Sequence, residues 1–181
     1  MKVRRSGLVL DGLVILGWFL VTGVLGGLLW WQLADLPEVT RFQGRAVLQP
    51  TELTKEVSID GWFFVIAVVG GVLGGVVLSA WRRRDPVVTV LLVTAGAVLA
   101  AYAMLATGQV VGPDEQTAVL RAAADGATAP MQLAPHAPGV VWVWPAAAAL
   151  GSLILLWLTP QRDASEDRPA SQVDEASQSP A

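Results

Sequence analysis

Two aspartates lie next to long apolar segments, and their carboxylates are the side chains of this sequence best placed to do chemistry. Asp11 precedes the apolar stretch that begins at Gly12, and Asp60 precedes the stretch that begins at Gly61. A carboxylate at a membrane boundary can bind a cation or relay a proton, because partial burial makes its protonation switchable. Asp11 and Asp60 are therefore the candidate functional polar residues, and both would suit a small transporter.

Structural roles compete with the functional ones. Asp11 follows the N-terminal arginines closely enough to form an interfacial salt bridge with one of them, and we favour that role because acids deep within a membrane are rare. Asp60 fits the N-cap of a helix, where its carboxylate would accept backbone N–H groups. The alternative is a site that faces the loops, with Arg41 or Arg45 as the partner of Asp60. We favour the cap.

The residues that are missing exclude several chemistries. The sequence has no cysteine, which excludes disulfides, thiolate nucleophiles and cysteine-ligated zinc. His136 is the only histidine, so one chain supplies neither the paired axial ligands of a membrane haem nor a histidine-rich zinc site. The glycine run at 70–75 lacks the Lys-Ser/Thr ending of a phosphate loop, and no basic patch beyond residues 82–84 suits nucleic acid. We therefore expect no enzymatic activity, no cofactor, no metal and no nucleic-acid partner.

The elements that must position these residues are membrane spans. Only 15% of the 181 residues are charged, whereas soluble domains carry about 25%. Four segments contain no Asp, Glu, Lys or Arg, and each has the roughly 20 residues that a helix needs to cross a bilayer. The uncharged segments are 12–31, 61–81, 87–107 and 140–159. We predict an all-α membrane protein whose four transmembrane helices cover about 8–31, 60–81, 87–107 and 140–159, the first an uncleaved anchor.

Basic residues set the expected orientation. Clusters of Lys and Arg precede the first span and join the second to the third at 82–84, and such clusters favour the cytoplasmic side. Both termini should then be cytoplasmic, with two extracytoplasmic loops at about 32–59 and 108–139. Tryptophans favour membrane interfaces, and seven of the eight lie near predicted span ends: Trp30, Trp31, Trp62, Trp81, Trp142, Trp144 and Trp157.

Glycines indicate how the spans pack. The first span contains Gly23 and Gly27, one helical turn apart, and the second contains two overlapping pairs made by Gly70, Gly71, Gly74 and Gly75. Missing side chains form a groove that lets a neighbouring backbone approach closely. We interpret these six residues as candidate helix-packing positions within one bundle, with the four on the second span sharing one broad face. A seam between two copies needs the same groove, so a homo-oligomer stays open as the alternative.

The two outer loops and the C-terminal tail carry weaker signals. Residues 45–49 read as a short extended segment, and Pro50 as the start of a short helix that continues into the second span. In the second loop, Pro113 with two acids suits a helix start and Asp125-Gly126 a helix stop, so we predict a surface helix over about 113–124. The tail, 160–181, is acidic and lacks apolar periodicity, which predicts a disordered cytoplasmic segment.

The arrangement over residues 5–159 resembles a family of small actinobacterial membrane proteins that carry only a domain-of-unknown-function label. The resemblance rests on short motifs: Trp30-Trp31, Phe42, Asp60-Gly61-Trp62-Phe63, the glycines at 70–75, Trp81-Arg82-Arg83, Gly108 and Gly112-Pro113. It implies a location in the plasma membrane and no assigned activity.

The sequence thus favours a multi-pass protein of the bacterial plasma membrane that works without catalysis, as an envelope-associated or assembly component. Its partners would be the lipid bilayer and either a second copy or another membrane protein. The alternative is a small transporter, or a transporter subunit, that uses Asp11 or Asp60.

Overall fold

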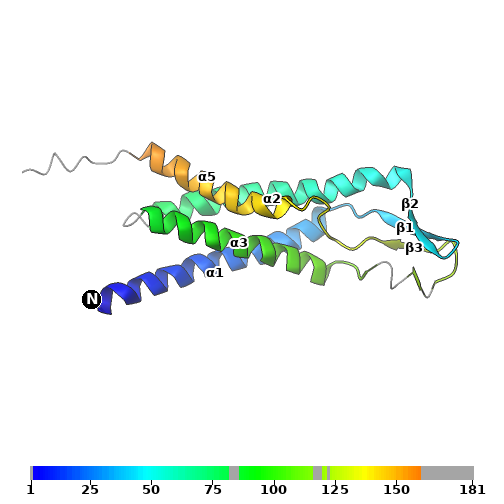
Figure 1. Ribbon diagram of the computed structural model, residues 1–181, viewed down its shortest axis with the longest axis horizontal. Coiled ribbons are helices and arrows are strands. Elements are labelled where there is room, and N and C mark those ends of the chain that lie inside the picture. Colours follow the sequence, from blue (N-terminus) through cyan, green and yellow to red (C-terminus); the bar gives the residue numbers. More distant parts are fainter. Residues whose placement is uncertain (1, 82–85, 116–119, 122, 160–181) are drawn as a thin grey trace, which may run out of the picture.

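The protein is mostly helical, and four of its helices are long and apolar enough to cross a membrane (Figure 1). The computed structural model describes residues 2–81, 86–115, 120–121 and 123–159. The four helices are α1 (Lys2–Leu33), α2 (Leu53–Trp81), α3 (Pro86–Val111) and α5 (Val143–Leu158). Each predicted span coincides with one of them. The basic cluster at 82–84 and the predicted tail, 160–181, lie outside the described residues.

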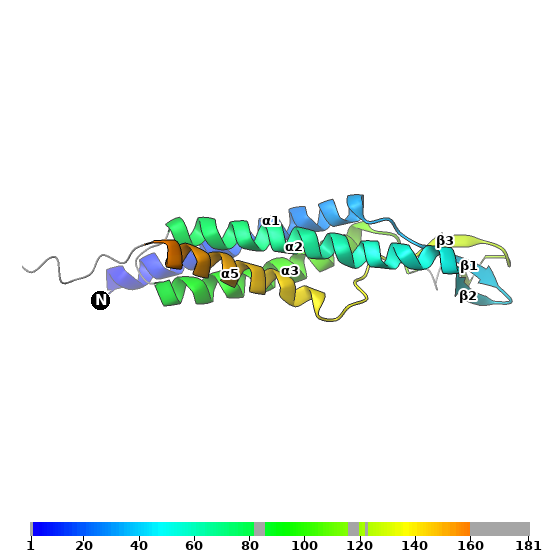
Figure 2. The ribbon, with the colours of Figure 1, turned by 90° about the horizontal axis from the view of Figure 1, so that it is seen from above.

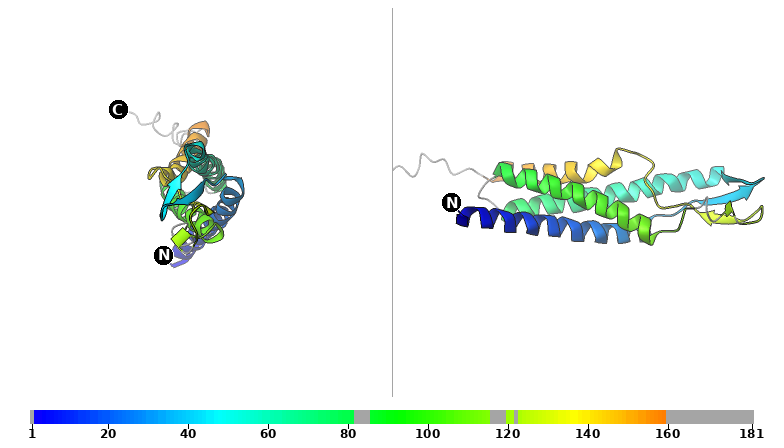
Figure 3. Two further views of the ribbon diagram at one scale, coloured as in Figure 1. Left: turned by 90° about the vertical axis from the view of Figure 1, so that its right-hand side faces the viewer. Right: turned by 60° about the horizontal axis from the view of Figure 1, so that its bottom comes forward.

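The four helices form an elongated bundle in which α1 packs chiefly along α3, and α2 along α5. Figures 2 and 3 show these pairs lying nearly parallel to the long axis. The N-terminus lies at the same end of the bundle as the end of α2, the start of α3 and the end of α5 (Figure 1). A small β-sheet lies at the opposite end, which we call the sheet end.

Short turns lead into two of the helices. The turn η1 (Pro50–Glu52) runs directly into α2, and η2 (Val140–Trp142) runs directly into α5. Proline fits such a first turn because its missing N–H would have no partner there. The turn that was predicted from Pro50 is therefore present, and it moves the start of α2 to Leu53 rather than Asp60.

Two of the tryptophans at span ends lie in the bundle core rather than at its surface. Trp30 is fully buried, its indole N–H donates to the carbonyl of Ile59 at 2.9 Å, and its ring packs edge-on against Phe63 with centroids 5.1 Å apart. Gly108 makes the room, because a Cβ there would lie 2.5 Å from the Trp30 ring. Trp144 is 1% exposed. The remaining five are exposed, as expected for interfacial residues: Trp31, Trp62, Trp81, Trp142 and Trp157.

The sheet end carries three antiparallel strands in the order β2-β1-β3. They are β1 (Glu38–Phe42), β2 (Arg45–Leu48) and β3 (Thr128–Pro130). Gln43 and Gly44 join the first two with φ of 49° and 75°, the left-handed pair that a two-residue hairpin turn requires. The extended segment predicted at 45–49 is therefore β2, whereas β1 and β3 were not predicted, so the fold is helical with a small sheet rather than purely α.

The surface helix predicted over about 113–124 lies partly outside the described residues. Residues 113–115 are not helical, and residues 116–119 lie outside the described part of the chain. Leu120 and Arg121 are helical, residue 122 again lies outside the described residues, and Gly126 turns the chain with a φ of 93°. Leu120 packs with Val39 and Ala129 in a small apolar cluster beneath the sheet. The described residues therefore place the predicted start, 113–115, outside a helix and Leu120 and Arg121 in helical conformation.

Candidate functional site

The carboxylate of Asp60 holds the loop between α3 and α5 against α2. Its two oxygens accept backbone N–H groups from His136 at 2.9 Å and from Ala137 at 3.0 Å. Asp60 lies seven residues after the start of α2 at Leu53, so it does not cap that helix as predicted. The carboxylate does accept backbone N–H groups, as predicted, but the donors belong to a distant loop rather than to the first turn of a helix. The residue therefore positions a loop through charge-assisted hydrogen bonds.

A second acid lies one helical turn before Asp60. Glu56 has one carboxylate oxygen 3.9 Å from Nε2 of His136. Both the ring and the carboxylate are partly exposed. The contact is an ion pair only when the histidine is protonated, because a neutral imidazole carries no charge. Asp60 and Glu56 thus hold the segment with the sole imidazole of the sequence near the start of α2. Spacing along the chain could not predict this, because His136 and Glu56 are 80 residues apart.

Arg41 binds β1 to the same loop between α3 and α5. Its Nη1 donates to the carbonyls of Leu120 at 2.5 Å, Arg121 at 2.9 Å and Ala123 at 2.6 Å. Its Nε lies 3.2 Å from a carboxylate oxygen of Asp125, at ion-pair distance but outside hydrogen-bond geometry. A guanidinium suits this position because carbonyls at the end of a helical turn carry partial negative charge. Arg41 therefore binds the loop, and the suggested pairing with the acid on α2 is not what the structure shows.

Further polar contacts fix the hairpin at both ends. The backbone N–H of Gly44, in the hairpin turn, donates to Asp125 at 3.2 Å. At the other end, Glu52 accepts the backbone N–H of Glu38 at 3.1 Å and pairs with Lys55 at 2.9 Å. The sheet is thus attached to the start of α2 as well as to the second loop. We call the strands together with the described residues of 120–131 the sheet module.

The other acid singled out in the sequence lies at the far end of the bundle. Asp11 belongs to α1 and precedes the apolar segment of that helix, Gly12–Leu33; its side chain is not among those described. The described spans bury only three polar side chains, those of Ser79, Thr89 and Ser152. Across the described residues no group of three or more His, Cys, Asp or Glu side chains could hold a metal ion.

The two glycines of α1 lie against α3. A Cβ at Gly23 would lie 2.5 Å from the carbonyl oxygen of Ala100, and one at Gly27 would lie 2.6 Å from that of Met104. Side chains cannot occupy such distances, which are far below the 3.5–4.0 Å of ordinary carbon contacts. The close approach of α1 and α3 therefore depends on these two residues.

The four glycines of α2 contact two different neighbours rather than sharing one face. Gly71 and Gly75 lie against the backbone of α5, where a Cβ at Gly71 would be 2.7 Å from the carbonyl oxygen of Trp144. A Cβ at Gly74 would lie 3.0 Å from the ring of Phe19 on α1. Gly70 lies against the indole of Trp144. The contacts of all four are with helices of the same chain.

The fold defines the class of protein, a membrane protein built on four helices that are long and apolar enough to span a bilayer. Comparison with protein-family models, curated proteins and solved structures finds no match for the chain. The resemblance to a family of small actinobacterial membrane proteins therefore stays a prediction. Function has to be argued from the residues at the sheet end.

Proposed function

We propose that this chain is a non-enzymatic component of the bacterial plasma membrane that presents the sheet module to a partner in the cell envelope. The observation that carries the proposal is that the two outer loops form one small folded unit. Arg41 joins the loops to each other, and Asp60 joins the second loop to α2. Loops that only connect spans need no such unit, whereas a surface that must recognise a partner benefits from preorganisation.

The outer face of the sheet supports a binding role. Val39 and Leu48 pair across the strands and face the apolar cluster beneath the sheet. Side chains alternate along a strand, so Phe42 and Val47 belong to the opposite face, where they are 62% and 45% exposed. The outer edge of β2 is unpaired within the described residues. An apolar face beside an open edge is a surface that a partner strand or loop can cover.

A crosslinking experiment tests the proposal. A photo-activatable residue at position 42 should give a protein adduct in native membranes, because the side chain at this position projects from the exposed face of the sheet. The matched control is position 102, where Tyr102 is similarly exposed at 53% but lies on the span α3. Adducts at position 42 and not at 102 would support the proposal. Equal yields at both positions, or none at position 42, would overturn it.

The orientation belongs to the same proposal. Cytoplasmic termini are supported by the basic clusters and by the placement of the N-terminus and the end of α5 at one end of the bundle (Figure 1). A cytoplasm-only reporter fused after Ala181 should be active, and periplasmic reporters inserted after Thr51 and after Thr128 should be active as well. A reporter that places Ala181 outside would refute both the orientation and an outward-facing sheet module.

Transport through Asp11 or Asp60 is the alternative. Two loop amides already occupy the carboxylate of Asp60, and the apolar interior described above offers few polar groups to a solute. Proton- or cation-coupled flux that is lost in Asp11→Asn or Asp60→Asn, while the protein stays folded, would favour transport instead. Unchanged flux in both variants would eliminate a carboxylate mechanism.

A further inference from the structure

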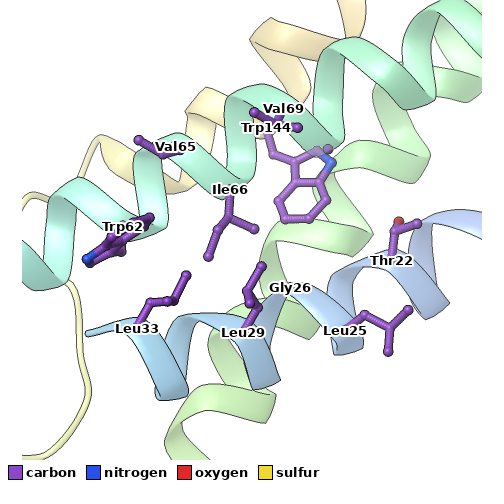
Figure 4. A pocket seen from close by; sticks show the side chains of 11 residues that line it. Thr22, Leu25, Gly26, Leu29, Leu33, Trp62, Val65, Ile66, Val69 and Trp144 are labelled. Carbon is purple, nitrogen blue, oxygen red and sulfur yellow. The ribbon is translucent and has the colours of Figure 1, made fainter. Parts of the chain in front are cut away.

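A groove runs between α1 and α2 on the surface of the bundle (Figure 4). Its volume is about 330 Å³. Leu25 and Leu29 belong to its α1 wall, and Val65 and Val69 belong to its α2 wall. The indole of Trp144, which comes from α5, reaches between the two walls (Figure 4).

The groove exists because α1 and α2 each pack chiefly against a different partner. Trp144 enters the space between them, where two glycines make room for its ring. A Cβ at Gly26 on α1 would lie 3.2 Å from the indole, and one at Gly70 on α2 would lie 2.8 Å from it. The ring therefore forms the floor of the groove between α1 and α2.

The lining offers hydrocarbon and almost no hydrogen bonds. The four aliphatic wall residues are 47–58% exposed. The hydroxyl of Thr22 donates to the carbonyl of Trp18 in its own helix at 2.9 Å. The indole nitrogen of Trp144 is buried and has no hydrogen-bond partner among the described residues, so the floor presents ring carbons. Such a surface selects an apolar ligand.

The length and position of the groove match one lipid chain. On α1 the lining extends from Thr22 to Leu33, which is twelve residues and a rise of about 17 Å along the helix. One leaflet of a bilayer occupies about 15 Å, half of the ~30 Å hydrocarbon core. Leu33 is the last residue of α1, and Trp62 at the same end supplies an indole suited to headgroup depth. We propose that this groove binds one acyl chain of a phospholipid from the leaflet on the sheet side.

A helix from a second copy fits the groove less well. Helices associate in membranes through small residues that allow close backbone approach. The two glycines of the groove, Gly26 and Gly70, are already covered by the Trp144 ring, so no small-residue stripe is left for a partner helix. A helix is also about 10 Å wide, and Ile66 and Leu29 project toward each other across the groove (Figure 4).

Photolabelling of the full chain tests this proposal. The protein is reconstituted in vesicles of phosphatidylethanolamine and phosphatidylglycerol with a small fraction of phosphatidylcholine that carries a diazirine midway along one chain. Labelled residues are then mapped by mass spectrometry. Leu29 and Val65 should be labelled roughly tenfold more than Leu91 and Leu153, the ratio expected if the groove buries about two extra methylene groups. The controls are equally or more exposed span residues, at 65% and 55%, outside the groove.

A filling variant adds an independent readout. Leu29→Trp should lower the labelling of Val65 to the control level, whereas Leu91→Trp should leave it unchanged. Gel filtration checks that both variants stay folded; if one does not, the wild-type labelling ratio still decides. Equal labelling of groove and control residues in the wild type would overturn the proposal, and so would a crosslink from the groove to a second copy of the chain.

Discussion

Replacing Gly71 by alanine adds a single methyl group between α2 and α5. The new Cβ would lie 2.7 Å from the carbonyl oxygen of Trp144, 2.8 Å from the methyl of Ala147 and 3.1 Å from the backbone nitrogen of Ala148. Carbon atoms pack at about 3.5–4.0 Å, so α5 would have to move away by roughly 0.7 Å. Two of these three atoms belong to the backbone, which no rotamer change can move aside. Overpacking of this kind costs about 1–3 kcal/mol.

The matched control is alanine at Gly61 in the same helix. A Cβ at Gly61 meets nothing within 4 Å, so this variant carries the same gain in helix propensity, up to about 1 kcal/mol, without the clash. The difference in the free energy of unfolding between the two variants therefore isolates the packing cost. Gly71→Ala should be less stable than Gly61→Ala by about 1–3 kcal/mol.

Unfolding in mixed detergent micelles, followed by tryptophan fluorescence, measures this difference, and gel filtration measures the size of the folded particle. Loss of stability at unchanged size is the expected result, because Gly71 contacts α5 of its own chain. A smaller particle at unchanged stability would mean that the residue lies in a seam between copies. Equal stability of the two variants would refute the packing argument itself.

Three further changes address the sheet end and the bundle core. Asp60→Asn leaves one acceptor oxygen for two loop amides. Hydrogen exchange of those amides should therefore accelerate by about tenfold or more, while exchange in the spans stays slow. Unchanged exchange would contradict the role of Asp60 in holding the loop. Arg41→Lys should expose the second loop to protease, because an ammonium lacks the guanidinium fork. Arg45→Lys is the control at an exposed position and should not increase cleavage; equal cleavage of the two variants would contradict the role of Arg41. Trp30→Phe removes a buried hydrogen bond to α2 and should cost about 1 kcal/mol, a loss that Trp31→Phe at the surface should not share.

The sequence was most informative where one physical requirement acts along a continuous segment. Crossing a bilayer requires about 20 uncharged residues in a row, and all four spans could be located from that rule alone. Close approach of helices requires small residues one turn apart, and Gly23 and Gly27 do lie against the backbone of α3. Spacing could not predict which neighbouring helix each glycine contacts, because the four glycines of α2 contact two different helices.

The sheet end could not be predicted for the opposite reason. β1 and β3 are five and three residues long, and they pair across a gap that contains two spans. Local signals in the second loop favour a helix, but no local signal indicates that carbonyls of this loop accept hydrogen bonds from Arg41. Asp60 was a candidate functional residue because it borders a span. Its loop partners could not be predicted, because they lie 76 and 77 residues further along the chain.

The pairing of β1 with β3 also sets an order of events during synthesis. The hairpin ends at Leu48 and β3 begins at Thr128, so the ribosome adds 79 residues between the two. At 5–20 residues per second this takes about 4–16 s. Throughout that interval the edge of β1 has no neighbour and the Arg41 guanidinium has no carbonyls to bind. Two further spans must enter the membrane before the third strand can dock. A completed sheet therefore marks a chain whose first three spans have been inserted, and a chain that stalls earlier exposes an open strand edge to aggregation.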